Sequence, residues 1–290
     1  MSLRLRSAVE HVETPAVGVA PPQHTELVER LLARVPEEPD ALAPDLVALV
    51  YAVADPQGHK TTASHLNHRT GGAAHGFALT DQGVGGPFIA LRVARAYART
   101  GRGTAPLVAV VESGGTAGAS AASGVLLRLD GSDGRDGRRE VDGADGADGA
   151  DGADGAGGRR GPDGPDGPEG RGGLALADTV AVPVDRLAQA WAELVPEKGR
   201  LLLVLGPGTD PGAAPAERTD VRTAPADSSC TAVWRLLAQE AESWRGRYAT
   251  VALCAVDTAT GTGHLAVLRD LDDESEPPAG STEEEEARHG

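Results

Sequence analysis

Three short runs of the chain are almost entirely apolar, and they limit the possible folds more than any other feature. They are DLVALVYAV at Asp45–Val53, LVAVV at Leu107–Val111 and LLLVL at Leu201–Leu205. Strands that are buried on both faces, as in a parallel sheet covered by helices, have this near-continuous apolar pattern. Segments with helical spacing alternate with them, including Thr25–Val35 and Val184–Val195. Strands that alternate with helices predict an α/β fold.

The segment Phe77–Thr100 predicts a strand that turns sharply into a helix. Its turn contains three glycines, Gly83, Gly85 and Gly86. Pro87 suits the first helical position, because the backbone N–H that proline lacks has no helical partner there. Many enzymes use such a turn to hold a nucleophile against the positive end of the helix dipole, whereas this chain presents Val84. One face of the expected helix carries an arginine stripe, typical of a solvated face or of a partner contact: Arg92, Arg95 and Arg99.

The composition changes abruptly between Asp130 and Gly173. Glycine occupies every third position from Gly131 onward, and Glu140 is the one exception. This period is the collagen signature, because only glycine fits at the axis of a triple helix. Few of the triplets contain proline, however, and the segment has almost nothing apolar to bury. We therefore predict a flexible acidic insertion, and a collagen-like trimeric structural protein remains an alternative.

The insertion divides the chain into two parts, and each part shows the alternation of strands and helices that is typical of an α/β fold. The predicted units are an N-terminal half at 1–129, the insertion at 130–173 and a C-terminal half at 174–270. The remaining residues, 271–290, are acidic and include four consecutive glutamates at Glu283–Glu286. Such a composition predicts a disordered tail.

Charge and cysteine content exclude several classes of protein. The formal net charge of −16 argues against nucleic acid and against an anionic membrane surface, because both attract positive charge. The two cysteines, Cys230 and Cys254, are too few for a disulfide framework and fit a reducing compartment. The N-terminal sequence MSLRLRSAVEHVE is too polar for a signal peptide, and no apolar run is long enough to span a bilayer. We expect a cytoplasmic protein.

The most distinctive stretch of the chain is PFIALRVARAYARTGRGTAPLVAVVES, Pro87–Ser113. In the second part, LLLVLGPG precedes a helix start at Ser228 and two closing strands around DTATGTGHLAVLR, Asp257–Arg269. In this order the chain resembles the thiolase superfamily, and most closely its type III β-ketoacyl synthases, over Asp45–Leu129 and Leu174–Arg269. The resemblance implies two similar α/β halves in a five-layered αβαβα body, with the Gly-X-Y segment inserted between them.

The resemblance also implies that the catalytic residues of these enzymes are missing. The nucleophilic cysteine corresponds to Val84, and its alanine and serine neighbours correspond to Gly83 and Gly85; a valine cannot form a thioester. The histidine of the family follows the strand that is Leu201–Leu205 here, where GPGTDPGAAP contains none. The asparagine corresponds to Asp227, whose charge would repel a developing oxyanion. Acyl transfer of the family's kind is therefore expected to be lost.

The function predicted from these departures is that of a catalytically degenerate ketosynthase-like protein. It would form a homodimer, or a heterodimer with an active ketosynthase, or it would bind an acyl chain. Acyl-carrier protein and an acyl-thioester are further expected partners. No cofactor is expected. A residual cleft is predicted from Asp81, Gln82, Asp227, Ser228 and Cys230.

The alternative is an acyltransferase with a non-standard nucleophile at Cys230, Asp81 or Ser228. Cys230 stands in the first turn of an expected helix, whose dipole can lower the pKa of a thiol. Buried packing is the competing interpretation, because free cysteine is among the most buried residue types.

Four histidines fall close together in the sequence: His59, His65, His68 and His75. His65 and His68 are three positions apart on an expected helix at Thr61–Thr70, so both could face one ion. No cysteine or carboxylate joins them at a recognisable spacing. We interpret them as surface or loop histidines and expect no metal site.

Overall fold

The computed structural model describes residues 2–14, 16–51, 61–101, 103–114, 120–131, 173–196, 198–210 and 218–271. The predicted insertion at 130–173 lies outside these residues except for 130, 131 and 173. The predicted tail lies outside them except for Leu271.

The described strands form one ten-stranded sheet in the order β3-β2-β4-β5-β1-β6-β10-β9-β7-β8. The N-terminal strands are β1 (Leu3–Glu13), β2 (Leu46–Tyr51), β3 (His75–Thr80), β4 (Pro106–Glu112) and β5 (Ala122–Gly131). The C-terminal strands are β6 (Leu174–Pro183), β7 (Leu201–Leu205), β8 (Thr219–Thr223), β9 (Thr250–Asp257) and β10 (Thr262–Asp270). The helices are α1 (His24–Leu32), α2 (Thr62–Arg69), α3 (Gly86–Arg99), α4 (Leu187–Leu194) and α5 (Ala232–Trp244).

The strand order repeats itself, which confirms that the chain consists of two similar halves. The series β3-β2-β4-β5-β1 corresponds to β8-β7-β9-β10-β6, strand for strand. In each half the first three strands are parallel and the last two join antiparallel. The halves meet in a short antiparallel pairing of β1 with β6, where Leu3 faces Leu176 and Arg4 faces Ala175.

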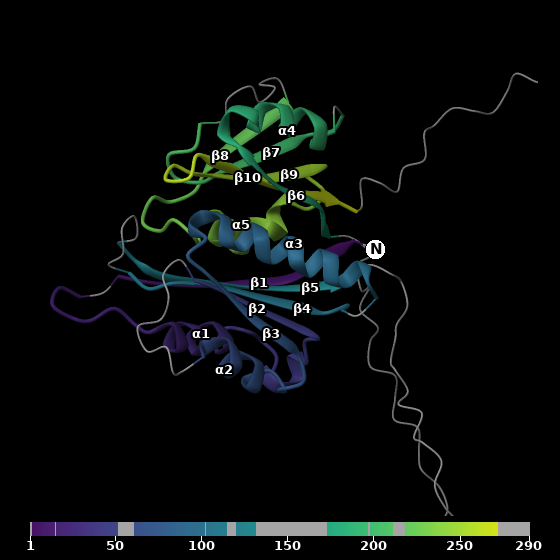
Figure 1. Cartoon of the computed structure of the whole chain (residues 1–290). Coiled ribbons are helices and arrows are strands. Elements are labelled where there is room, and N and C mark those ends of the chain that lie inside the picture. Colours follow the sequence, from purple (N-terminus) through teal and green to yellow (C-terminus); the bar gives the residue numbers. More distant parts are fainter. Residues whose placement is uncertain are drawn as a thin grey trace, which may run out of the picture.

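Figure 1 shows the five layers of the predicted αβαβα body. Helices α1 and α2 cover the outer face of the N-terminal strands, α4 covers the outer face of the C-terminal strands, and α3 and α5 lie between the two sets. The buried apolar residues form three clusters that match the three interfaces. The largest cluster surrounds α3 and α5, and it includes Phe88, Leu91, Trp234 and Leu237.

Two elements differ from the sequence prediction. Strand β8 was not expected, because TDVRT is polar and lies at the edge of the sheet, where one side of the strand has no neighbour among the described strands. The helix expected from Ser228 begins instead at Ala232, since the residues before it form a separate turn described below. None of the described helices is both long enough and apolar enough to span a membrane.

Candidate functional site

The turn before α3 adopts the sharp geometry predicted for it. Asp81 and Gly83 have positive φ angles of 58° and 49°, and a short 3-10 helix, η2 (Gly83–Gly85), leads directly into α3. The Gly85 N–H donates to the Gln82 carbonyl oxygen at 2.9 Å. Asp81 and Gln82 are exposed, and the half-buried Val84 packs against the central apolar cluster. Val84 is therefore part of the core packing.

His264 of β10 lies directly over this turn. A Cβ atom on Gly85 would stand 2.5 Å from Cε1 and 2.6 Å from Nε2 of His264, which is too close for any side chain. Gly85 is required by this approach. The imidazole is 6% exposed and stacks on Phe88, with ring centroids 5.5 Å apart and an interplanar angle of 26°.

Burial lowers the pKa of His264, and the positive charge of Arg92 lowers it further, while the carboxylate of Asp257 acts in the opposite direction. The ring is therefore neutral at neutral pH. Its Nδ1 has no hydrogen-bond partner among the described residues. A buried polar atom without a partner is uncommon in folded proteins. His264 is thus a polar group that the surrounding protein has left unsatisfied.

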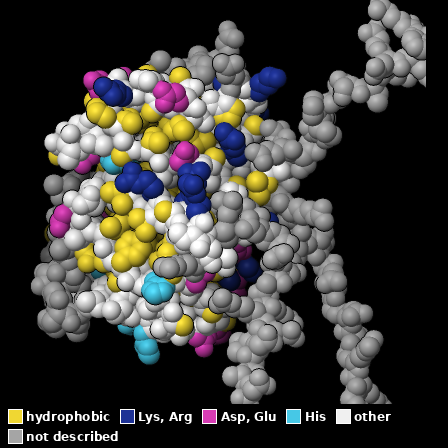
Figure 2. Space-filling view, turned by 45° about the vertical axis from the view of Figure 1, so that its right-hand side comes forward, with side chains coloured by type: hydrophobic (Ala, Val, Ile, Leu, Met, Phe, Trp, Pro, Cys, Tyr) yellow, Lys and Arg dark blue, Asp and Glu magenta, His cyan; other side chains and the backbone are white. Residues whose placement is uncertain are grey.

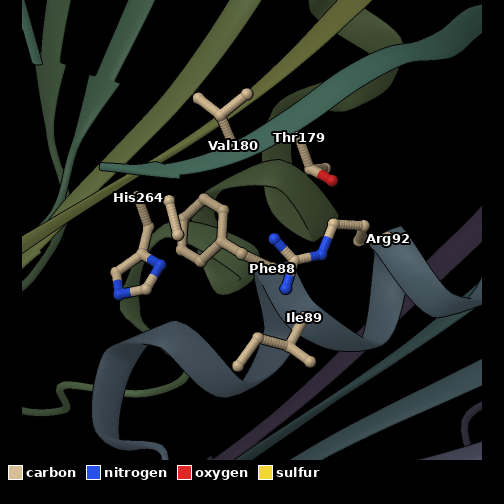
Figure 3. Close-up of a pocket in the computed structure, with 7 residues that line it drawn as sticks. Phe88, Ile89, Arg92, Thr179, Val180 and His264 are labelled. Atoms are coloured by element: carbon tan, nitrogen blue, oxygen red, sulfur yellow. The ribbon is translucent and has the colours of Figure 1, made fainter. Parts of the chain in front are cut away.

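A small hollow opens beside His264, between α3, β6 and β10 (Figure 3). It is lined by Phe88, Ile89, Arg92, Thr179, Val180, Ala181 and His264. Its empty volume is about 160 Å³, part of it open to solvent. The hollow has room for about one water molecule, so it is too small for a long acyl chain.

The turn before α5 is the counterpart of the turn before α3 in the other half, and a carboxylate fills it. Glu112, the last residue of β4, is 2% exposed and accepts hydrogen bonds from five donors. At 2.7–3.3 Å these are Ser229 N, Ser229 Oγ, Cys230 N, Thr231 N and Thr231 Oγ1. A helix N-terminus attracts an anion, and here the protein supplies its own.

The remaining residues of the predicted cleft are engaged in the same region. Arg235, which is 5% exposed, donates from Nη1 to Asp227 Oδ1 at 2.6 Å and to Ser228 Oγ at 3.0 Å. The negative charge of Asp227 is therefore paired with the guanidinium of Arg235. Ser228 is fully buried. Burial, followed by the charge of Glu112, raises the pKa of the Cys230 thiol well above its ordinary value, so the lowering expected from a helix dipole is not observed.

The structure thus divides the predicted cleft residues between two places. Asp81 and Gln82 stand at the start of α3, whereas Asp227, Ser228 and Cys230 stand at the start of α5. Three residues that sequence reasoning missed shape these places: His264, Asp257 and Glu112. His264 and Asp257 lie within DTATGTGHLAVLR, and a lone histidine in an alternating strand carries no signal of what it will face.

Within the described residues, His65 of the histidine cluster lies against a carboxylate. His65 Nε2 is 2.6 Å from Glu29 Oε1, and Arg69 Nη1 donates to the other oxygen of Glu29 at 2.5 Å. This triad joins α2 to α1. No group of three or more metal-binding side chains occurs in the described part of the chain, which does not include His59.

No protein-family model matches the sequence, and no curated protein sequence matches it. The fold, in contrast, matches many solved structures. Against 3-oxoacyl-[acyl-carrier-protein] synthase III from Aquifex aeolicus, the TM-score is 0.57 at 12% identity, covering 92% of this chain and 99% of that one. An OleA variant from Xanthomonas campestris gives 0.58 at 11% identity over 93% and 98%. A tetronic acid condensing enzyme gives 0.58 at 12% identity over 92% and 99%. The chain therefore has the thiolase-like fold of type III ketosynthases.

Proposed function

We propose that the chain is a thiolase-fold protein that has no condensing nucleophile and acts as the non-catalytic partner subunit of an active ketosynthase. The observation that carries the proposal is Val84, a hydrocarbon side chain at the position where this fold can hold a nucleophile. The proposal places the chain in fatty-acid, polyketide or related specialised metabolism. A cytoplasmic location belongs to the same proposal and rests on two free, buried thiols.

The closed start of α5 also supports a non-catalytic role. Backbone N–H groups at a helix start can stabilise an oxyanion when they point into an empty site. Here the N–H groups of Ser229, Cys230 and Thr231 all donate to Glu112. A reacting oxygen would have to displace a buried carboxylate that is bound by five donors.

The small size of the hollow favours a partner subunit over an acyl-binding protein. An acyl chain of ordinary length needs a tunnel, and two hollows in the described part of the chain are small, with empty volumes of about 160 and 200 Å³. An acyl-binding function would require the two halves or their loops to open. It therefore remains the secondary form of the proposal.

Strand β3 is the surface that we propose for pairing. It lies at one end of the sheet, and among the described strands it pairs only with β2. Its sequence HGFALT contains no Lys, Asp, Glu or Pro, which are residues that commonly protect an edge strand from other chains. Basic and hydrophobic side chains also lie next to each other on one face of the molecule, a composition that suits a protein interface (Figure 2).

Acyl loading tests the absence of catalysis. The whole chain is incubated with acyl-CoA and with an acylated carrier protein, and its intact mass is measured beside that of an active ketosynthase. We expect a mass gain for the ketosynthase alone. A stable acyl adduct on this chain would contradict the proposal. If the adduct disappeared in Cys230→Ala, the alternative acyltransferase with Cys230 as nucleophile would take its place.

Sedimentation velocity tests the pairing. Ala78 is exposed in β3, and Ala78→Lys adds a charge to the edge that should prevent strand pairing. Ala96→Lys is the matched control, because Ala96 is exposed on α3 away from the edge. We expect the wild type and the control to associate with themselves or with a co-expressed ketosynthase, and Ala78→Lys to remain monomeric. Equal association of all three would exclude β3 as the interface.

A further inference from the structure

We propose that a basic cluster at the starts of β7, β8 and β9 binds the acidic C-terminal segment of the same chain. The cluster consists of Lys198, Arg200, Arg218 and Arg247, and the segment is 272–290. The inference rests on charge and position, so it does not depend on the proposed pairing with a ketosynthase.

The first observation is that two arginines of the cluster share one carboxylate. Arg200 Nη2 donates to Asp220 Oδ2 at 2.9 Å, and Arg247 Nη2 lies 4.0 Å from the same oxygen. Tyr248 donates its hydroxyl to that oxygen as well, at 2.6 Å. The guanidinium carbons of Arg200 and Arg247 lie 5.3 and 5.1 Å from the centroid of the Tyr248 ring. Two cations are thus held together with a single negative charge between them.

The other two cations of the cluster add charge that no described carboxylate compensates. Arg218 donates to the carbonyl oxygens of Pro196 and Gly199, at 2.6 and 3.4 Å, which places its guanidinium next to the start of β7. Lys198 is exposed in the same short stretch. Neither Arg218 nor Lys198 forms an ion pair with a described residue. In the described part of the chain, four cations therefore gather around one carboxylate, and such a surface attracts an anionic partner.

The second observation is where the acidic segment begins. Asp270, the last residue of β10, donates its N–H to the Ala249 carbonyl oxygen at 3.1 Å, and its carboxylate accepts a hydrogen bond from Gly246 N. Gly246 immediately precedes Arg247 in the chain. The segment 272–290 therefore starts beside the cluster.

The segment has the complementary charge and enough length to reach every member of the cluster. Its sequence DDESEPPAGSTEEEEARHG contains eight acidic residues and one arginine. Glu283 is twelve residues beyond Leu271, and twelve residues can span up to about 40 Å. Strand β8 is three strand spacings from β10, which is about 14 Å. A partner tethered this closely has an effective concentration in the millimolar range, so weak ion pairs are sufficient to bind it.

Binding of the segment would also protect an edge of the sheet. Strand β8 pairs only with β7 among the described strands, and its Val221 is exposed. An uncovered edge strand can associate with strands of other chains, and proteins commonly cover such edges. The bound segment would shield the start of β8 in this way.

The test is carbodiimide cross-linking of the full chain, which joins a lysine amine to a carboxylate as an amide, with the water taken up by the carbodiimide. The chain contains two lysines, Lys198 in the cluster and Lys60 in the N-terminal half. Peptide mass spectrometry locates the links. We expect Lys198 to link to Glu283–Glu286 in much higher yield than Lys60 does. The yield should fall several-fold in about 1 M NaCl, where the Debye length is about 3 Å.

Arg247→Gln removes one charge of the cluster and leaves Lys198 in place. It should lower the yield of the Lys198 link by about two- to fivefold, as for the loss of an exposed ion pair. Arg34→Gln is the matched control, because Arg34 is exposed just after α1 in the other half, and it should leave the yield unchanged. Equal losses for the two variants would show a general effect of net charge and overturn the site.

Isotope labelling identifies the chain that supplies the segment. In a mixture of unlabelled and ¹⁵N-labelled protein, links within one chain join two peptides of the same label, which is the expected result. Links between a labelled and an unlabelled peptide would show that the segment comes from a second copy and would overturn binding within one chain. Equal yields for Lys198 and Lys60, or a Lys198 yield that does not depend on salt, would overturn the proposal itself.

Discussion

The starts of α3 and α5 occupy equivalent positions in the two halves, yet they are built in opposite ways. Each follows an edge strand and faces the central layer (Figure 1). The start of α5 encloses the carboxylate of Glu112, which reaches it from β4 in the other half. The start of α3 consists of glycines, and no carboxylate of the described residues accepts a hydrogen bond from its backbone. A duplicated fold has thus closed one helix start and left the other without an internal anion.

The residues immediately before the two helices also differ in how they contact the neighbouring strand. Thr231 immediately precedes α5, and its Oγ1 lies 2.6 Å from Ser123 Oγ of β5. Gly85 immediately precedes α3, and it faces His264 of β10, the strand equivalent to β5. A hydrogen bond joins Thr231 to Ser123. Gly85 only contacts the ring of His264, whose Nδ1 has no hydrogen-bond partner among the described residues. The comparison indicates that hydrogen bonds hold the start of α5, whereas close packing against His264 holds the start of α3.

Removing the carboxylate of Glu112 should change the free energy of unfolding more than any other variant described here. Glu112→Ala removes the acceptor of five donors, of which those of Cys230 and Thr231 are buried, and we expect a loss of about 3 kcal/mol in the free energy of unfolding. Urea unfolding followed by the fluorescence of the buried Trp234 and Trp244 measures it. The control Glu37→Ala removes an exposed carboxylate that pairs with Arg128, and it should cost less than about 1 kcal/mol. Similar losses for both variants would show that Glu112 does not hold the start of α5.

Thiol reactivity compares the two starts directly. Cys230 at α5 is buried with a raised pKa, and burial raises the pKa of Cys254 to about 12. Both should react with a disulfide reagent at pH 8 on the order of a thousandfold more slowly than free cysteine, because little thiolate is present. Val84→Cys places a thiol at the half-buried start of α3, where it should react faster than either native thiol. Rapid labelling of the wild type under native conditions would contradict the closed state of α5.

Filling the glycine turn should have a smaller effect on stability. Gly85→Ala forces a Cβ into the ring of His264, and we expect a cost of about 1–3 kcal/mol, typical of overpacking. Gly76→Ala is the control, because a Cβ there would meet its neighbours at ordinary contact distance. Adding His264→Ala to Gly85→Ala should recover part of the loss. A double variant whose losses simply add would show that the two residues do not press on each other.

The pH dependence of His264 should be the smallest effect. Burial and Arg92 lower the pKa of this histidine in the folded state and Asp257 opposes them, so the unfolded chain binds the proton more readily. The folded state therefore loses stability as the pH falls below about 6.5, the ordinary value for histidine, toward the lowered value. Compared with His264→Gln, the wild type should lose more of its free energy of unfolding between pH 7.5 and pH 5. Parallel pH profiles of the two proteins would contradict this assignment.

Much of the fold followed from apolar patterning. The run LLLVL corresponds to β7 at Leu201–Leu205, and the strand, turn and helix expected at Phe77–Thr100 are β3, η2 and α3. These segments were predictable because a buried strand or an amphipathic helix records its environment in its own residues. Strand β8 was not predictable, since a polar edge strand is defined by its neighbour, not by its composition.

The candidate site was predictable only in part, because its contacts join residues far apart in the sequence. The sequence by itself determined the glycine turn and the valine within it, Val84, both of which are local properties. The tertiary structure alone decided that Glu112 closes the start of α5, 117 positions away at Ser229, and that His264 covers Gly85. Local patterns specify what each segment becomes. Which side chain contacts the start of each helix, Glu112 at α5 or His264 at α3, is decided only when the two halves pack together.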